Sequence, residues 1–422
     1  MLGECFRLCS LPILRSQERD HLNRTGVWLI GARGSIATVT IAGQLAATRG
    51  LMPPIGLVSE RPAFAAAELP AVDGMVFGGH EIRRLPLREV ARQILVGCGI
   101  HGLAEQLATE LDRVDADIRP GVTRGAGPQV DGSGETVVPV DSDREAIDVI
   151  RRDLDAFRHR HGLSRLVVVN LASTEPPAAP QACWASWDRL TAAIADGSSA
   201  LPASALYACA ALDAGDAYIN FTPSLGARFP ALEDLALRRG AVHAGSDGKT
   251  GETLVKSVLA ELFSRRNLPV LSWFGQNILG NEDGRVLDDP HHKASKIRSK
   301  DHLLPKILGY SPQTRVGIDY VASLGEWKIA WDHIHFEGFL GGRMSMQFTW
   351  NGVDSLLAAP LVLDLVRFAA LAQRRGERGV LSALAAFFKG PMGTDEQRLI
   401  RQDEMLLAWA VGGTGRTGTS GE

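Results

Sequence analysis

The residues best suited to chemistry in this sequence are lysines. Lys296 and Lys300 lie four residues apart in Lys293-Ala-Ser-Lys-Ile-Arg-Ser-Lys300, so a helix would place both ammonium groups on one face. Like charges at this spacing destabilise a helix by roughly 0.2–0.5 kcal/mol, unless an anion lies against them. The segment therefore indicates either an anion-binding site or an exposed basic helix, and the pattern alone does not separate the two.

A glycine turn near the N-terminus is a second candidate for binding phosphate. The apolar run Gly26-Val-Trp-Leu-Ile30 leads into Gly31-Ala-Arg-Gly-Ser-Ile-Ala37 and then into a helical pattern that reaches about Thr48. This strand–turn–helix order is typical of dinucleotide-binding units, whose free helical amides bind a phosphate. Arg33 occupies the place of the second glycine in G-x-G-x-x-G, so an ordinary tight turn is the alternative.

A third candidate is the turn Ser246-Asp-Gly-Lys-Thr-Gly-Glu-Thr253. It contains Gly248-Lys249-Thr250 but is no P-loop, because His243 stands where that motif requires glycine. The turn follows an apolar strand, and loops at the carboxyl ends of parallel strands bind ligands in open α/β sheets. A solvated turn that caps a helix is the alternative.

We expect no bound metal. His333 and His335 suit one face of a strand, but no carboxylate partner is evident for them or for His291 and His292. The five cysteines form no C-x-x-C pair and are too few for a disulfide framework, which favours a reducing, cytoplasmic location.

Charge and hydropathy exclude several classes of protein. The 422 residues include 45 Lys and Arg against 48 Asp and Glu, a formal charge of −3, so we expect neither nucleic acid nor a membrane surface as partner. The longest apolar stretch, residues 356–372, is interrupted by Pro360, Asp364 and Arg367, and therefore predicts no membrane span.

The elements that must position these residues alternate between helix and strand. Residues 145–161 have the apolar spacing of an amphipathic helix, and a second apolar run covers residues 55–58. Buried strands are predicted at residues 166–169, 218–220 and 241–244. This βαβα order predicts a doubly wound, mostly parallel sheet.

The pattern changes after Gly245. Residues 246–348 are richer in Lys, His and Trp and their strand patterns alternate, which favours a half-solvated antiparallel or mixed sheet. Residues 354–375 then form a long apolar helix that Asp354 is expected to cap. Pro360 predicts either a kink in that helix or a start closer to Pro360.

Six segments in the same order, from about Gly26 to Gln402, resemble motifs of the myo-inositol-1-phosphate synthase family. They are Phe77-Gly-Gly-x-Glu81-Ile82, the Gly245–Leu259 turn and helix, Asn277-x-Leu-Gly-Asn281-x-Asp-Gly284, Ser295-Lys-Ile-Arg-Ser-Lys300, Asp319-Tyr-Val-Ala-Ser-Leu-Gly-Glu-Trp-Lys328, and Asp354-Ser-Leu-Leu-Ala-Ala-Pro360.

Other positions depart from the family's motifs. Arg33 and Ala37 replace glycines, His80-Glu81 replaces Trp-Asp, Glu326 replaces aspartate, and residues 170–175 read N-L-A-S-T-E in place of W-T-A-N-T-E. These departures lie more on the cofactor side than on the substrate side, and they leave the identity of the sugar phosphate open.

The resemblance implies a Rossmann-type NAD-binding domain with an inserted α+β catalytic and oligomerisation domain, and a homotetramer. With it we expect the NAD-binding domain at 24–245, the inserted domain at 246–349 and C-terminal helices that return to the NAD-binding domain at 350–411. The composition of the ends predicts a flexible N-terminus at 1–23 and a disordered Gly/Thr/Ser-rich tail at 412–422.

The reaction implied is the redox-neutral conversion of D-glucose 6-phosphate to inositol phosphate. It oxidises C5, enolises the ketone, closes the ring by an intramolecular aldol step and reduces the ketone again. Oxyanions that form in such steps need fixed cations, the phosphate needs a cationic cradle, and desolvated, crowded lysines acquire lowered pKa values suited to proton transfer. A related cyclase for another hexose phosphate, a non-catalytic binding protein and a plain NAD dehydrogenase are the alternatives.

The resemblance also implies roles for particular residues. Lys296 and Lys328 would stabilise oxyanions, Lys389 would assist hydride transfer, and Lys300 with Lys249 would hold the phosphate. The catalytic set is Lys296, Lys300, Lys328, Lys389 and Asp247. The substrate-binding set is Lys249, Asn277, Lys300, Asp319 and Glu326. The NAD-binding set is Gly31, Arg33, Gly34, Ser35, Ile36, Glu81, Ser173, Thr174, Asp247, Asn281 and Asp354.

Overall fold

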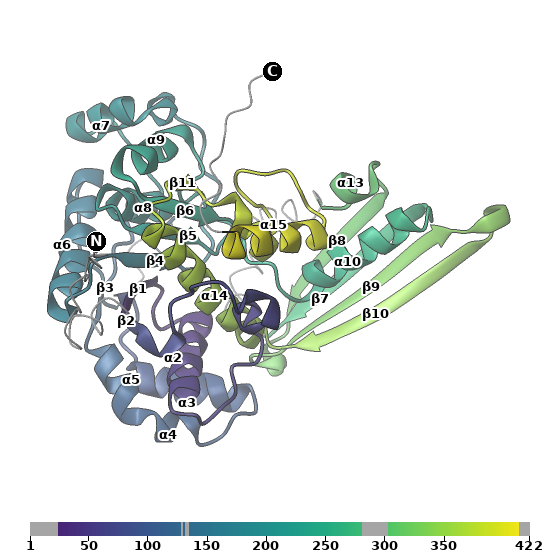
Figure 1. Ribbon diagram of the computed structural model, residues 1–422, viewed down its shortest axis with the longest axis horizontal. Helices are drawn as coiled ribbons and strands as arrows, with labels where there is room; N and C mark the ends of the chain where they lie inside the picture. Colours follow the sequence, from purple (N-terminus) through teal and green to yellow (C-terminus); the bar gives the residue numbers. More distant parts are fainter. Residues whose placement is uncertain (1–23, 128–129, 131–134, 281–302, 413–422) are drawn as a thin grey trace, which may run out of the picture.

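The computed structural model describes residues 24–127, 130, 135–280 and 303–412 (Figure 1). The expectations for residues 1–23 and for most of 412–422 lie outside these residues. The strands are β1 Thr25–Ile30, β2 Met75–Glu81, β3 Ile118–Pro120, β4 Leu166–Asn170, β5 Ala217–Asn220, β6 Val242–Gly245, β7 Val270–Leu279, β8 Gln313–Tyr320, β9 Lys328–Glu337, β10 Arg343–Gly352 and β11 Gly379–Val380.

The helices alternate with these strands. They are α2 Ser35–Thr48, α3 Leu87–Gly97, α4 Leu103–Gln106, α5 Ala108–Asp115, α6 Asp143–His161, α7 Trp187–Asp196, α8 Ala203–Asp213, α9 Pro230–Arg239, α10 Gly251–Arg265, α13 Leu303–Leu308, α14 Asp354–Arg374 and α15 Leu399–Val411. Short 3₁₀ turns lie at Val58–Glu60, Pro62–Phe64, Val72–Gly74, Ala182–Ala185, Ala322–Leu324, Phe339–Gly341 and Ser382–Phe387.

Seven parallel strands form the first sheet, in the order β3-β2-β1-β4-β5-β6-β11. Successive residues of β4 pack on opposite faces: Val167 joins a core with α2 and α14, while Val168 joins a core with α6 and α8. Both faces are thus covered, as continuous apolar strands require. The predicted doubly wound Rossmann-type sheet is confirmed.

Most predicted elements of this sheet form close to their expected positions, but the strand beside β1 was not predicted. The apolar run at residues 55–58 ends in a 3₁₀ turn, and the strand beside β1 is β2. Two glycines disguise β2 in the sequence. A Cβ on Gly79 would lie 2.2 Å from the Leu29 carbonyl oxygen, so close packing of the strand requires glycine there.

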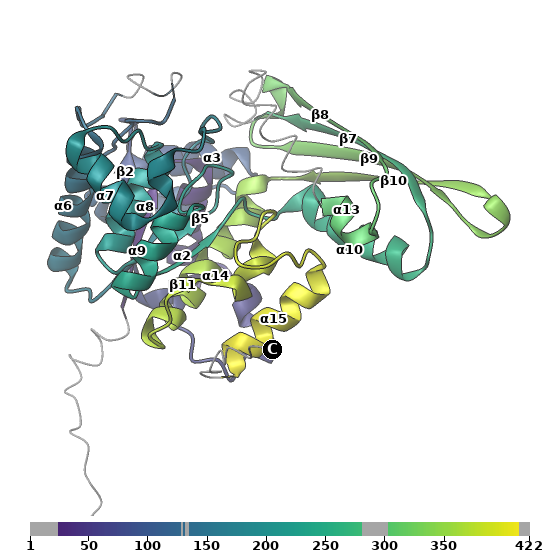
Figure 2. The same ribbon diagram turned by 90° about the horizontal axis from the view of Figure 1, so that it is seen from above.

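A mixed four-stranded sheet follows, in the order β10-β9-β7-β8, with β7 and β8 parallel and the other pairs antiparallel. Helices α10 and α13 lie on one face of it, and no described helix covers the other face (Figure 2). Phe263 and Trp273 lie in the core between the helices and this sheet. The expected half-solvated second sheet is confirmed, and it reaches far from the first sheet (Figure 1).

Helix α14 returns the chain to the first sheet. It begins at Asp354 and continues through Pro360, so a start near Pro360 is wrong. Its N-cap is Val353, and the Asp354 carboxylate binds Lys328 instead of capping the helix. By length and composition α14 is apolar enough to cross a membrane, but 78% of its most apolar window is buried inside the fold. Packing in the core explains that composition.

Candidate active site

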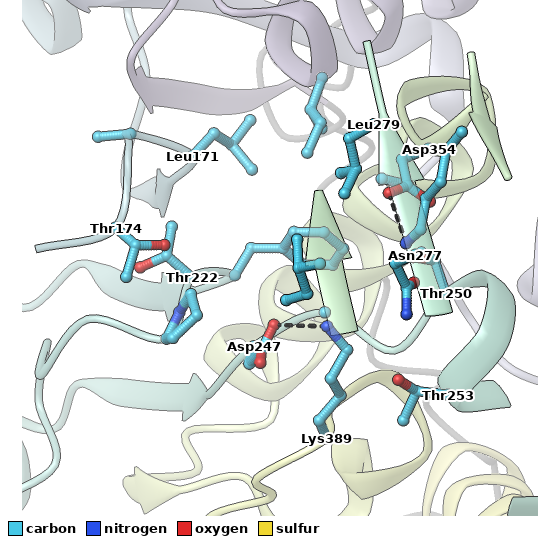
Figure 3. A pocket seen from close by; sticks show the side chains of 18 residues that line it. Leu171, Thr174, Thr222, Asp247, Thr250, Thr253, Asn277, Leu279, Asp354 and Lys389 are labelled. Carbon is cyan, nitrogen blue, oxygen red and sulfur yellow. Dashed lines mark hydrogen bonds and ion pairs between the residues drawn. The ribbon is translucent and has the colours of Figure 1, made fainter. Parts of the chain in front are cut away.

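A cavity lies where the carboxyl ends of the parallel strands meet the second sheet (Figure 3). It encloses about 890 Å³ of space free of protein atoms, part of it open to solvent. Its walls come from both sheets, the start of α2, the start of α14 and the segment after residue 387. The lining residues are Ile36, Leu171, Ala172, Thr174, Phe221, Thr222, Pro223, Asp247, Gly248, Thr250, Thr253, Asn277, Leu279, Ile318, Lys328, Asp354, Ala358 and Lys389.

Three successive strands end beside this cavity. Thr174 follows β4, Thr222 follows β5 and Asp247 follows β6. Parallel strands end at one edge of the sheet, so residues far apart in sequence converge there. The sequence predicted this location for the Asp247 turn.

Lys389 and Asp247 form an ion pair on one wall, with 2.9 Å between Nζ and Oδ1 (Figure 3). The backbone holds the two residues together as well. Lys389 N donates to the Asp247 carbonyl at 2.7 Å, and Lys249 N donates to the Phe387 carbonyl at 2.8 Å. Asp247 has a positive φ of 63°, which these bonds stabilise.

Lys328 and Asp354 form a second ion pair, with 3.1 Å between Nζ and Oδ2. Lys328 begins β9 and Asp354 begins α14, so this pair joins the second sheet to the helix that returns to the first. The helix N-terminus also stabilises the Asp354 carboxylate.

The charge state of Lys328 differs from the expectation for crowded lysines. Burial, the largest influence, lowers the pKa of Lys328, but Asp354, Glu252 and Asp247 together outweigh burial and raise that pKa above its usual value. The expected lowering is therefore wrong for Lys328. Its partners are carboxylates, and a fixed ammonium ion suits stabilisation of an oxyanion better than proton abstraction.

Asn277 places an unpaired amide at the cavity. The residue is 1% exposed, and within the part of the chain that the structure describes neither its Nδ2 nor its Oδ1 has a hydrogen-bond partner. A buried amide without partners costs about 1–3 kcal/mol, so such a group in a native fold calls for a ligand or water. An amide that can both donate and accept suits a hydroxyl group. The structure thus brings Asn277 to the cavity, as predicted.

The glycine turn at the start of α2 has the features of a dinucleotide phosphate site. Gly31 has φ 79°, and a Cβ on it would lie 3.2 Å from the Ala172 Cα. The first helical hydrogen bond is Thr38 N to the Gly34 carbonyl, so the amides of Ser35 and Ile36 have no partner within the helix and can bind an anion.

Arg33 takes no part in the cavity lining. Its Nε pairs with Asp115 at 2.8 Å and its Nη1 donates to the Arg83 carbonyl at 2.7 Å, so the guanidinium points to α5 and the end of β2. Its amide donates to Glu81 Oε2 at 2.7 Å. Glu81 ends β2, the usual place for the acidic residue that binds the adenosine ribose.

Four other predicted residues are not brought to the cavity. Lys249 is 1% exposed and its amine donates to Gln402 Oε1 on α15 at 2.6 Å, so the prediction that it holds a phosphate needs correction. Asp319 is exposed and accepts a hydrogen bond from Gln276. Glu326 lies against Gly97 at the end of α3, and Ser173 is exposed beside Thr174.

Three predicted residues, Asn281, Lys296 and Lys300, lie outside the described residues. Among the described residues, no group of three or more His, Cys, Asp or Glu is placed to hold a metal ion.

Several lining residues escaped the sequence analysis, among them Phe221, Thr222 and Ile318. Thr222 carried a signal that could have been used, because it follows the end of a predicted parallel strand. Ile318 carried none, because its place at the cavity depends on how the second sheet meets the first.

The fold and the site together define a class of NAD-dependent α/β protein, in which a Rossmann-type sheet supplies the dinucleotide site and two lysine–carboxylate pairs line a cavity between that sheet and a second one. Residues 25–410 match the family model described as myo-inositol-1-phosphate synthase. The chain belongs to this family, whose cofactor is NAD.

Known relatives agree with this assignment. The chain is 30% identical to inositol-3-phosphate synthase 1 of Bacteroides thetaiotaomicron, over 94% of this chain and 96% of that protein. It is also 30% identical to the Rattus norvegicus protein of the same name, over 78% of this chain and 62% of the rat protein. A myo-inositol-1-phosphate synthase-related protein from Thermotoga maritima is 26% identical, with a TM-score of 0.75 over 92% of this chain and 98% of that one.

Proposed function

We propose that this chain is an enzyme that uses NAD to convert D-glucose 6-phosphate to myo-inositol phosphate without net oxidation or reduction. The observation that carries the proposal is the pair of lysine–carboxylate contacts, Lys389–Asp247 and Lys328–Asp354, on the walls of one cavity. Both lysines match catalytic positions of the family to which the chain belongs.

The NAD fit rests on the α2 turn and on the strand ends. Free amides of Ser35 and Ile36 would bind the pyrophosphate, Glu81 the adenosine ribose, and Thr174 with Leu171 would lie at the nicotinamide end. NAD supplies a hydride acceptor and later a hydride donor when bound. The backbone of the glycine turn and the apolar side chains of the cavity would orient it and exclude water.

Proton and charge handling would fall to the lysine pairs. Lys328, kept protonated by Asp354, would hold its ammonium against the oxygen that becomes negative on enolisation and aldol closure. Lys389, oriented by Asp247, would assist at C5, where the hydroxyl proton leaves and returns. Asn277 would bind a sugar hydroxyl. Lys296 would stabilise a second oxyanion, and Lys300 would bind the phosphate of the substrate.

The test is to incubate the protein with glucose 6-phosphate and NAD, following inositol phosphate by phosphorus NMR and NADH by absorbance. We expect inositol phosphate without accumulation of NADH. Accumulating NADH would indicate a dehydrogenase. The departures at residues 33, 80 and 170–173 make a parallel run with mannose 6-phosphate and galactose 6-phosphate informative, because a related cyclase would turn over one of these instead. No turnover of any hexose phosphate would overturn the proposal.

The oligomer and location are proposals too. We propose a homotetramer assembled through the second sheet, with domain limits at 24–245, 246–349 and 350–411. The sheet face without a described helix supports this assembly, as do Phe339 and Leu340 at the tip of the β9–β10 hairpin, which are 91% and 90% exposed. A cytoplasmic location is supported by the free thiols of Cys98, Cys183 and Cys209. Light scattering of the purified protein tests the tetramer.

A further inference from the structure

A buried polar network lies directly behind the cavity wall, at the ends of β4 and β5. Asn170 and Asn220 end these strands and pair in register. Asn170 Nδ2 donates to Asn220 Oδ1 and to Thr222 Oγ1, both at 3.2 Å. The side chains of these three residues form the network, and each residue is at most 7% exposed.

The hydroxyl of Thr222 uses its whole hydrogen-bonding capacity. It donates its proton to Asn220 Oδ1 at 2.8 Å and accepts from Asn170 Nδ2 and from the Ser224 amide, each at 3.2 Å. A hydroxyl has one proton and two lone pairs, so none remains for a ligand. Although Thr222 lines the cavity, its polar atom is committed to the protein interior.

The amide orientations are fixed by their neighbours. Asn220 Nδ2 donates to the Ser224 carbonyl at 2.7 Å, and Asn170 Oδ1 accepts from the Ala172 amide at 3.2 Å. If the Asn220 amide were flipped, two oxygens would face each other at Ser224. If the Asn170 amide were flipped, two N–H donors would face each other at Ala172. One arrangement of the network is therefore favoured over the others.

This network reaches the Lys389–Asp247 pair through the backbone. Asp247 N donates to the Thr222 carbonyl, and Gly248 N donates to the Phe221 carbonyl, both at 3.0 Å. Asp247 has a left-handed backbone conformation that is unfavourable for a residue with a side chain, so the contacts around it must hold it there.

A direct path of bonds therefore leads from the buried amides to an amine on the cavity wall. Lys389 N donates to the Asp247 carbonyl at 2.7 Å, and Lys389 Nζ contacts the Asp247 carboxylate at 2.9 Å. A rotation of the Thr222 backbone would move Asp247 and, with it, the Lys389 amine.

We propose that Thr222 is a positioning residue for the Lys389–Asp247 pair, and that the hydroxyl–amide network with Asn170 and Asn220 holds it in place. This inference rests on the proposed function. Asn170 stands where the family's motif has tryptophan. One of the three members of the network is therefore a position at which this chain differs from that motif.

The test compares Thr222→Val, which keeps the shape of the side chain and removes the hydroxyl, with Thr222→Ser, which keeps the hydroxyl. In Thr222→Val we expect kcat to fall at least about tenfold while KM for the sugar phosphate changes by less than about threefold, because a displaced catalytic group lowers turnover more than binding. Thr222→Ser should retain kcat to within about threefold.

A second readout does not depend on turnover. Lys389 in each variant is labelled with acetic anhydride, and its reactivity is quantified by mass spectrometry of its peptide. We expect Thr222→Val to change the labelling rate of Lys389, and Thr222→Ser to leave it unchanged. Ser199→Ala is the control for stability alone, because it removes a buried hydroxyl that bonds Asp143 far from the cavity.

Three results would overturn the inference: full kcat in Thr222→Val, equal loss in Thr222→Val and Thr222→Ser, or equal loss in Thr222→Val and Ser199→Ala. If the wild-type protein makes no inositol phosphate, the proposed function fails instead, and the labelling of Lys389 still decides whether Thr222 positions the pair.

Discussion

Lys328 and Asp354 meet at 3.1 Å although a complete β-hairpin separates them along the chain. The lysine opens that hairpin, and the aspartate opens the helix that follows it. Their contact closes the second sheet onto the first and places an ammonium ion in the cavity. The carboxylate therefore has two effects, since it fixes the position of the amine and keeps it protonated.

Removal of the Asp354 charge should change the acid–base behaviour of Lys328. Burial lowers the pKa of Lys328 and Asp354 is foremost among the carboxylates that raise it, so Asp354→Asn should lower that pKa. We expect the pH dependence of acetic anhydride labelling at Lys328 to move to lower pH, and kcat to fall about 10²-fold. Asp395→Asn, which breaks the exposed pair with Lys306, is the control and should change neither. An unchanged labelling profile in Asp354→Asn would contradict the assignment.

Lys389 and Asp247 should behave as one unit. Lys389→Met and Asp247→Asn should each reduce kcat by about 10²-fold or more, because each leaves its partner misplaced. The double variant should lose little beyond either single variant, since a shared interaction is removed only once. Independent, multiplying losses in the double variant would show that the two residues act separately. The measurement is steady-state kinetics by phosphorus NMR.

Lys249 should make stability depend on pH in the alkaline range. Burial lowers the pKa of Lys249 from 10.5 to about 8. Between these values the unfolded chain binds more protons than the folded one, so the free energy of unfolding should rise with pH, by at most roughly 3 kcal/mol. Lys249→Met has no titrating amine at this position and therefore lacks this pH dependence. In urea titrations we expect the free energy of unfolding of the wild type to rise relative to that of Lys249→Met from pH 8 to 10.5. If the difference between the two proteins stays constant over this range, the pKa of Lys249 is not lowered.

Gly31 should be essential for binding NAD. In Gly31→Ala the new Cβ would meet the backbone of Ala172 at 3.2 Å, in addition to the cost of a positive φ. Gly50→Ala is a matched control, because Gly50 also has a positive φ but no atom lies within 4 Å of its Cβ position. We expect Gly31→Ala to weaken NAD binding at least about tenfold by calorimetry, and Gly50→Ala to leave it unchanged. Equal effects of the two changes would mean that backbone strain alone is responsible.

Local patterns were enough to predict four of the seven strands of the first sheet, namely β1, β4, β5 and β6. Continuous apolar runs such as residues 166–169 identify strands buried on both faces, and the amphipathic spacing of residues 145–161 identifies α6. β2 was missed because Gly78 and Gly79 weaken its strand pattern. Glycine is required at these positions because the strand packs closely against Trp28 and Leu29, and a local pattern does not report such a tertiary contact.

The candidate site was predictable only in part, because residue type does not fix side-chain direction. Asn277, Lys328 and Lys389 were predicted from motifs and lie at the cavity. Lys249 is in an equally suggestive turn, yet its amine enters the interior and binds Gln402 on a helix about 150 residues later in the chain. No local pattern reports such a long-range partner.

The lining of the cavity runs from Ile36 to Lys389 and so draws on nearly the whole described chain. No contiguous fragment contains a complete set of its walls. During synthesis the nucleotide-binding strands emerge first, but the pocket is assembled only after the segment that carries Lys389 has left the ribosome. Truncation from the carboxyl end to just before Lys389 should therefore remove one wall of the cavity while all seven strands of the parallel sheet remain.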